Sequence, residues 1–182
     1  MHDMTASHLR SAFAGESQAH MRYLIYGDKA ERDGFPNVAR LFRAIAYAEQ
    51  VHAANHFQQL QDAWGAALTV AGAGFGLGPT AENLEVAIEG EEFEVAEMYP
   101  VYKAAAELQE EKGAVRSFDW AWRAEQIHAA MYKEAQAAVE AGKDYDIGPV
   151  YICSVCGHTV EGEAPDRCPV CNARRENYQQ FI

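Results

Sequence analysis

A five-residue motif occurs twice in the sequence and limits the folds that the chain can adopt. The first copy is Ala48-Glu49-Gln50-Val51-His52, and the second is Ala124-Glu125-Gln126-Ile127-His128. Positions three apart share a face of an α-helix, so each copy can direct one carboxylate and one imidazole at a common point. Two such helices predict a metal site that is shared between them.

Both copies of the motif lie on apolar helix faces, where an uncompensated carboxylate is costly. The apolar positions are Val38, Leu41, Phe42, Ile45 and Leu60 around the first copy, and Phe118, Ala121, Tyr132 and Val139 around the second. No lysine or arginine lies on either face. A metal cation is therefore the predicted partner of these carboxylates.

The hydrophobic pattern predicts an all-α four-helix bundle. Glycine and proline mark the helix ends, Thr5 or Ser7 would cap the first helix, and Thr80 would cap the third. Pro100 would kink or break the third helix. The predicted helices cover residues 5–32, 36 to near 65, 80–100 with a helical continuation to 112, and 114–141.

Three more carboxylates fall on or beside apolar faces. Glu16 lies in the middle of the first stripe, Glu91 lies within the third, and Glu94 lies at its edge. Five carboxylates in one core repel one another unless cations compensate them, so the sequence predicts two metal ions. We interpret His20 and His56 as packing residues. The predicted bundle ligands are Glu16, Glu49, His52, Glu91, Glu94, Glu125 and His128.

An uncharged stretch over residues 63–81 is long enough to cross a membrane. It contains five glycines and Pro79, and acidic rather than basic residues flank it. We therefore expect a long surface connection between helices and no membrane partner.

The cysteines predict a second, smaller metal module. Two Cys-x-x-Cys pairs, separated by eleven residues, hold all four cysteines of the chain: Cys153, Cys156, Cys168 and Cys171. Four thiolates suit one tetrahedral metal, and zinc and iron both fit. Disulfides are the disfavoured alternative because no export signal is evident. The predicted domains are a bundle over residues 1–142, a linker over 143–149 and the metal module over 150–182.

The charge balance limits the classes of molecule that the protein can bind. The formal net charge is −12, which argues against nucleic acid, because nucleic acid requires a basic face. The segment Met1–Met4 has neither the basic start nor the apolar run of a signal peptide. We therefore expect a cytoplasmic protein.

Taken together, these motifs closely resemble the rubrerythrin family. The resemblance rests on Gly15-Glu16, the two Ala-Glu-Gln-x-His motifs, Glu91-Glu92-Phe93-Glu94, Glu97-Met98-Tyr99-Pro100 and the cysteine pairs, which occur in the family's order. It implies a ferritin-like di-iron bundle and a rubredoxin-like module with a third iron. Knuckles of that module usually have glycine after the second cysteine of each pair; Gly157 fits, and Asn172 can adopt the same left-handed conformation.

The resemblance also implies ligand roles. Glu49 and Glu125 would bridge the irons, Glu16 and Glu94 would serve one iron, and Glu91 and His128 would serve the other. His52 would exchange with Glu94 as the oxidation state changes, which gives both residues a catalytic role. Tyr23 and Tyr99 would lie next to the ligands.

The function implied is a non-haem di-iron peroxidase that reduces hydrogen peroxide to water and protects against oxidative stress. Electrons would arrive through the cysteine-bound iron from another rubredoxin or an NAD(P)H-dependent reductase. Two alternatives remain open: an iron-oxidising or iron-storage protein of the ferritin-like class, and a scaffold whose cysteine site holds zinc.

Helix length suggests a homodimer. The distance from Glu125 to Ala141 is about 24 Å along a helix, and the linker then leads farther away unless it folds back. We therefore expect electrons to come from the module of a partner chain in a head-to-tail dimer.

Overall fold

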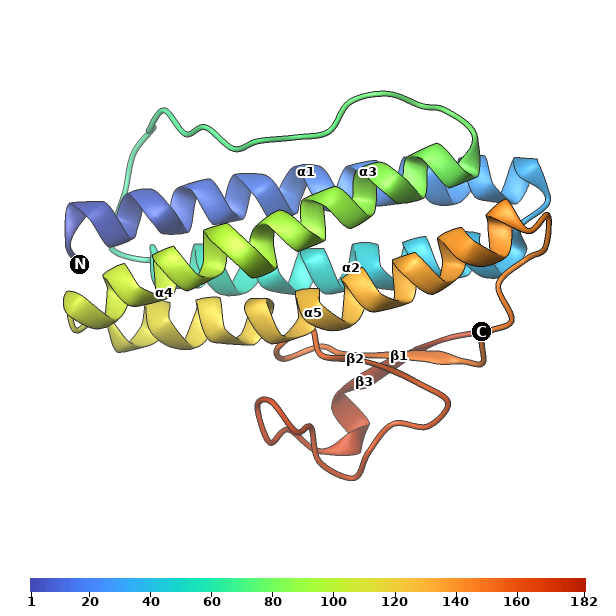
Figure 1. Ribbon diagram of the computed structural model, residues 1–182. Coiled ribbons are helices and arrows are strands. Elements are labelled where there is room, and N and C mark those ends of the chain that lie inside the picture. The colour runs from blue at the N-terminus through green and yellow to red at the C-terminus, as the bar shows by residue number, and fades with distance from the viewer.

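Four long helical segments pack side by side in the computed structural model, which describes residues 1–182, and confirm the predicted bundle (Figure 1). The third segment is composite, because a π-helical turn over Glu94–Met98 joins α3 to α4. The helices are α1 (Asp3–Asp33), α2 (Pro36–Gln59), α3 (Thr80–Phe93), α4 (Tyr99–Leu108) and α5 (Lys112–Glu140).

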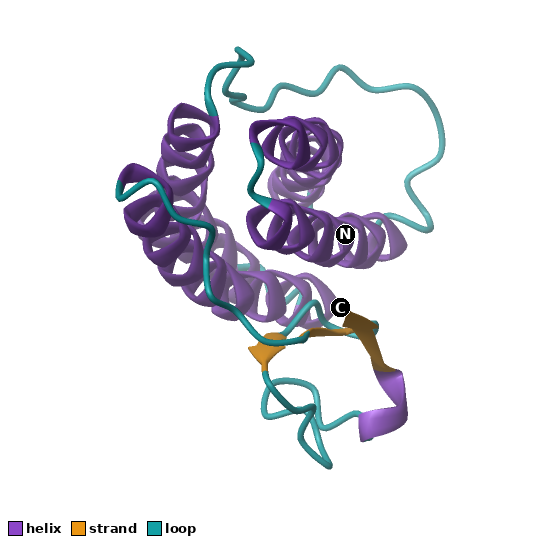
Figure 2. Ribbon diagram, turned by 90° about the vertical axis from the view of Figure 1, so that its right-hand side faces the viewer, coloured by secondary structure: helices purple, strands orange, loops and turns teal.

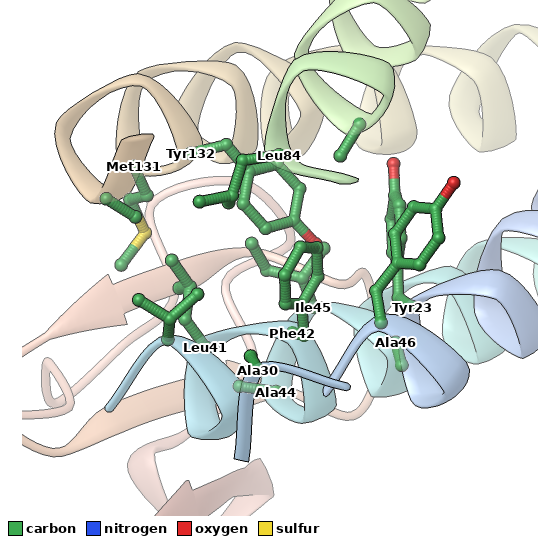
Figure 3. Close-up of a cluster of buried hydrophobic side chains, with 14 of the residues drawn as sticks. Tyr23, Ala30, Leu41, Phe42, Ala44, Ile45, Ala46, Leu84, Met131 and Tyr132 are labelled. Atoms are coloured by element: carbon green, nitrogen blue, oxygen red, sulfur yellow. The ribbon is translucent and has the colours of Figure 1, made fainter. Parts of the chain in front are cut away.

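Aromatic side chains from three helices form the centre of the larger apolar core (Figure 3). The ring of Phe42 lies 5.9 Å from that of Tyr23 and 5.1 Å from that of Tyr132, measured between centroids. All three side chains are buried. Each contributes on the order of 2 kcal/mol by leaving water, so this core sets the spacing of the helices that carry the metal ligands.

Two of the predicted helix caps are wrong. The Thr5 hydroxyl donates to Gln109 Oε1 at 2.5 Å, and α1 begins at Asp3 without a side-chain cap. Thr80 likewise donates its hydroxyl hydrogen to Asp33 Oδ2 at 2.7 Å instead of capping α3. In both cases a distant side chain competes successfully with the local backbone.

The third helical segment changes its winding before Pro100, not at it. Proline lacks an N–H and is tolerated in the first turn of a helix, and Pro100 lies in the first turn of α4, directly after the π turn over Glu94–Met98. The Trp122 indole N–H donates to the Val95 carbonyl at 3.0 Å within this turn. The helix therefore continues through Pro100, and the predicted kink or break at this residue is wrong.

Residues 63–79, which we call the strap, cross the outside of the bundle without regular structure (Figure 1). The strap connects the end of α2 to the start of α3. Two side chains of α1 hold it: Ser11 donates to the Val70 carbonyl at 2.8 Å, and Gln18 donates to the Gly72 carbonyl at 3.4 Å. The predicted surface connection is confirmed, and none of the helices has the length and apolar character that a membrane span requires.

The C-terminal segment forms a small antiparallel sheet in the order β2-β1-β3. Val150 pairs with Glu161 on one side and with Phe181 on the other. The sheet lies beside the bundle (Figure 2). β1 contacts α2, and β2 contacts α5. Its strands are β1 (Val150–Cys153), β2 (Thr159–Glu161) and β3 (Tyr178–Phe181).

The linker folds back along the bundle. The expectation that electrons come from a partner chain assumed a linker that leads away from the metal site. The Asp144 carboxylate accepts from the Asn37 and Val38 backbone N–H groups at 2.9 and 3.3 Å. Arg40 donates to the carbonyls of Ile147 at 2.5 Å and Gly148 at 3.2 Å. The module therefore lies along its own bundle, and the length of α5 gives no reason for electron transfer between chains.

Candidate metal centres

The first bundle cluster takes one residue from α1, two from α2 and one from α5. His52 Nδ1 lies 2.8 Å from Glu125 Oε1, 3.0 Å from Glu49 Oε2 and 3.8 Å from Glu16 Oε1. All four side chains are buried. One ligand atom from each of them lies within 4.8 Å of the others, so together they could hold a single metal ion.

The second cluster adds α3 and repeats the arrangement around the other histidine. His128 Nδ1 lies 2.7 Å from Glu125 Oε2, 3.3 Å from Glu49 Oε1 and 3.8 Å from Glu91 Oε2. Glu49 and Glu125 belong to both clusters. They therefore occupy the positions at which a carboxylate can bridge two metal ions.

Burial makes the carboxylate cluster unfavourable without cations. Desolvation and neighbouring carboxylates raise the pKa of Glu16 and Glu91 well above the usual value. Burial opposes the charged form of the histidines too, but Glu125 outweighs it and raises the pKa of His52 to about 10 and of His128 to about 9. Protons thus take the place of metal charge, and buried carboxylate oxygens of Glu16, Glu49, Glu91 and Glu125 lack hydrogen-bond partners. The residues fit a pair of divalent ions.

Glu94 is the one predicted bundle ligand that lies outside both clusters. It is half-buried at the first turn of the π segment. A Cβ atom added at Gly15 would lie 3.9 Å from Glu94 Oε1 and 4.0 Å from the Ala71 Cβ. Glu94 therefore lies between α1 and the strap, while His52 takes part in the first cluster.

Tyrosines and a second histidine surround the ligands. The Tyr23 hydroxyl donates to Glu91 Oε1 at 2.6 Å, and the Tyr99 hydroxyl donates to Glu16. His56 Nδ1 lies 2.8 Å from the Ser117 hydroxyl, and desolvation lowers the His56 pKa to about 3. His56 makes its hydrogen bonds with the Ser117 and Tyr99 hydroxyls, and its Nε2 also lies 3.7 Å from Glu16 Oε1. Its interpretation as a packing residue stays a prediction.

A cavity of about 510 Å³ leads from the surface to the clusters. The strap, α1 and the third helical segment form its walls, and Glu49, Glu91 and Glu94 line its inner end. Arg22 also lines it, with its guanidinium 5.3 Å above the ring of Tyr23. Arg22 was not among the predicted site residues, although its spacing of four from Gln18 places the two on one helix face.

The four cysteines of the module converge as predicted. Cys153 Sγ lies 3.7 Å from Cys171 Sγ, and Cys156 Sγ lies 3.5 Å from Cys168 Sγ. A tetrahedral metal with bonds of about 2.3 Å places its sulfurs about 3.8 Å apart, so the site fits one ion. Gly157 and Asn172 have φ values of 80° and 63°, which confirms the left-handed position after each cysteine pair.

Fold and sites together define a ferritin-like di-iron protein with a rubredoxin-like module. The family model described as rubrerythrin matches residues 7–136, and the model of the rubrerythrin rubredoxin-like domain matches residues 151–179. The chain belongs to the rubrerythrin family. Its donor sets are consistent with iron cofactors in the bundle and in the four-cysteine site.

Several relatives match along nearly the whole chain. Rubrerythrin-2 of Clostridium acetobutylicum is 49% identical over 98% of this chain and 97% of its own length. Nigerythrin of Nitratidesulfovibrio vulgaris is 28% identical over 97% of this chain and 86% of its own length. A structure described as the fully reduced, all-ferrous state of nigerythrin superposes on this chain with a TM-score of 0.85 and is 28% identical to it. The superposition covers 100% of this chain and 88% of the nigerythrin chain. These likenesses support an oxidoreductase role.

Proposed function

We propose that this protein reduces hydrogen peroxide to water. Each peroxide molecule takes up two electrons and two protons, its O–O bond breaks, and two water molecules form. The observation that carries the proposal is the position of the four-cysteine module, which contacts the helices that bear both cluster histidines. An electron-transfer module at this position suits repeated reduction of the bundle site.

The residues around the clusters have distinct roles in this proposal. The six residues of the two clusters, with Glu94 beside them, would hold two iron ions, which in the ferrous state would supply the two electrons. Glu94 lies where the cavity meets the clusters, within reach of an incoming peroxide, and is the candidate that passes a proton to the leaving oxygen. The buried core behind Glu16 and Tyr99 excludes water from the opposite side.

The partners follow from the same proposal. Residues 1–142 act as the catalytic unit and residues 150–182 as the electron-transfer unit, joined by the linker 143–149. The module accepts electrons from an external donor such as a rubredoxin or an NAD(P)H-dependent reductase. A homodimer and a cytoplasmic setting, in which the four cysteines stay reduced, remain part of the proposal.

Single-turnover kinetics test the function. In a Cys168→Ala variant, the bundle that has been chemically reduced in advance should still consume one peroxide per di-iron site. Steady-state turnover with an external donor should fall by roughly a hundredfold, or about 2.7 kcal/mol, because re-reduction is lost. Ser154→Ala, an exposed non-ligand in the same knuckle, is the matched control. If the reduced bundle fails to consume peroxide in both variants, the peroxidase assignment is wrong.

Storage of iron is the second candidate, because a two-metal carboxylate site also suits ferrous oxidation. A storage protein needs a cage of many chains, whereas the proposed enzyme needs none. Size-exclusion chromatography and the amount of iron retained after aerobic ferrous loading separate the two. A zinc-bound scaffold would be colourless and inactive.

The cavity predicts a second measurable effect. Ala71 is half-buried in the strap above Gly15, so Ala71→Leu should narrow the path to Glu94. We expect kcat/KM for peroxide to fall roughly tenfold while iron content stays unchanged. Ala66→Leu, which lies on the exposed part of the strap, should leave kcat/KM unchanged. Equal rates in the two variants would show that peroxide enters elsewhere.

A further inference from the structure

The cavity that leads to the clusters is much larger than hydrogen peroxide requires. Its volume is about 510 Å³. Hydrogen peroxide, with two oxygen atoms, needs roughly twice the volume of a water molecule, which occupies about 30 Å³ in the liquid. Pockets of about 300–1,000 Å³ with apolar walls and a few polar groups are typical of sites for small organic molecules. The cavity can therefore hold a substrate that carries an organic chain.

Arg22 is the only cationic side chain on the wall of this cavity. Its guanidinium donates a hydrogen bond to the side-chain oxygen of Gln18, and its Nε is buried without a partner. It forms no ion pair with the glutamates that line the same cavity, which are Glu49, Glu89, Glu91 and Glu94. Hydrogen peroxide is neutral and needs no cation. An unpaired guanidinium instead suits a carboxylate, which it can bind through two parallel hydrogen bonds.

Neighbouring residues hold the guanidinium of Arg22 in place. It lies 5.3 Å from the centroid of the Tyr23 ring. Its partner Gln18 is itself attached to the strap, because the Gln18 amide donates to the Gly72 carbonyl at 3.4 Å. A group that is ordered before binding loses little conformational freedom when a ligand arrives. Arg22 is thus prepared to bind an anionic group.

The distance from Arg22 to the inner end of the cavity suits a short chain. A Cβ atom added at Gly90 would lie 3.7 Å from Arg22 Nη2, so α3 passes close to the guanidinium. Glu94 follows Gly90 by four residues, or about 6 Å along a helix. The apolar side chains on the cavity wall include Val70, Ala71, Ala73 and Val86. A molecule with a carboxylate at one end and a peroxide group at the other therefore finds a matching group at each end.

We propose that Arg22 is a substrate-binding residue that holds the carboxylate of a short-chain organic hydroperoxide, with the peroxide group of the substrate at Glu94. The O–O bond breaks, two electrons and two protons are taken up, and one alcohol and one water molecule form. The ferrous ions of the proposed function are the reductant, and both become ferric. The carboxylate stays on Arg22 throughout. This inference rests on the proposed peroxide reduction and adds a second class of substrate to it.

A matched pair of substrates tests this inference in single-turnover experiments. The first substrate is the terminal hydroperoxide of pentanoic acid, and the second is the methyl ester of the same molecule, which has no charge. Iron-loaded wild-type protein that has been chemically reduced in advance should consume the acid roughly tenfold faster than the ester at equal low concentrations. The reason is that the ester lacks the charge that Arg22 binds.

Three variants assign this preference to Arg22. Arg22→Met removes the charge, so the ratio of the acid rate to the ester rate should fall to about one. Arg22→Lys keeps the charge without the planar fork and should give an intermediate ratio. Arg32→Met makes the same change at an exposed position of α1 outside the cavity and should leave the ratio unchanged. The proposal is overturned if the wild-type protein consumes acid and ester equally fast, or if Arg22→Met keeps the wild-type ratio because it slows both substrates alike.

Calorimetric binding of pentanoate, which carries no peroxide group, separates this inference from the peroxidase assignment. The iron-loaded wild-type protein should bind pentanoate, and the iron-loaded Arg22→Met variant should bind it roughly tenfold more weakly. If hydrogen peroxide is consumed but both proteins bind pentanoate equally, the carboxylate site at Arg22 is wrong and the peroxidase assignment stands. If pentanoate binding depends on Arg22 but the reduced protein consumes no peroxide of either kind, the carboxylate site stands and the proposed function is wrong.

Discussion

Glu91→Ala should remove peroxide reduction, whereas Glu92→Ala should leave it intact. The two residues are neighbours on α3, but Glu91 is 2% exposed and belongs to the second cluster. Glu92 points outward and pairs only with Lys133 on the surface at 2.5 Å. Removing a cluster carboxylate leaves one metal position with too few ligands, while an exposed ion pair contributes less than about 1 kcal/mol to stability.

Metal content and turnover check this pair of variants. Elemental analysis of the wild-type protein should give about three irons per chain, from the bridged pair and the four-cysteine site. Glu91→Ala should lose at least one bundle iron and retain the iron of the module. Turnover should fall by about three orders of magnitude or more, about 4 kcal/mol. Zinc in the cysteine site, or full activity in Glu91→Ala, would contradict the assignment.

Metal-free protein should lose stability as pH rises from 6 to 10. The folded-state pKa of His52 is about 10 and that of His128 about 9, both above the ordinary 6.5. A group whose pKa is raised by folding stabilises the folded state fully at pH values below its pKa in the unfolded state. This stabilisation is lost as the pH rises through the pKa of the folded state. The raised pKa values of Glu16 and Glu91 act in the same direction, because the folded state keeps protons that the unfolded state releases.

Calorimetry with and without metal measures this effect. We expect the metal-free bundle to lose several kcal/mol of stability across this pH range, seen as a fall in Tm of more than about 10 °C. The loaded protein should change much less, because metal charge replaces the protons. His128→Gln removes one of the two titrating rings and should reduce the slope in the metal-free protein. Stability that stays constant or increases toward pH 10 would show that the cluster is not protonated in this way.

The fold and most of the bundle metal ligands could be predicted, because the sequence patterns that indicate them lie within single helices. Each Ala-Glu-Gln-x-His motif places a carboxylate and an imidazole on one helix face, and the surrounding apolar pattern identifies that face as buried. The same logic found Glu16 and Glu91. It works because helix periodicity relates sequence spacing directly to direction in space.

The features that could not be predicted depend on contacts between distant residues. The course of the linker follows from Asp144 at the start of α2 and from Arg40, more than a hundred positions away in the sequence. The π turn that carries Glu94 lies just before Pro100 and accepts a hydrogen bond from the distant Trp122. The contact between His128 Nε2 and the Thr159 hydroxyl likewise arises only because β2 packs against α5.

The strap divides the molecule into two helical hairpins, which supply different numbers of the predicted metal ligands. The first hairpin, α1 with α2, supplies Glu16, Glu49 and His52, and everything after the strap supplies Glu91, Glu94, Glu125 and His128. Each cluster draws ligands from both sides of this division. The metal ions therefore act as cross-links between two halves of the polypeptide, and a chain cut within the strap would keep its halves together through its metals as well as its core.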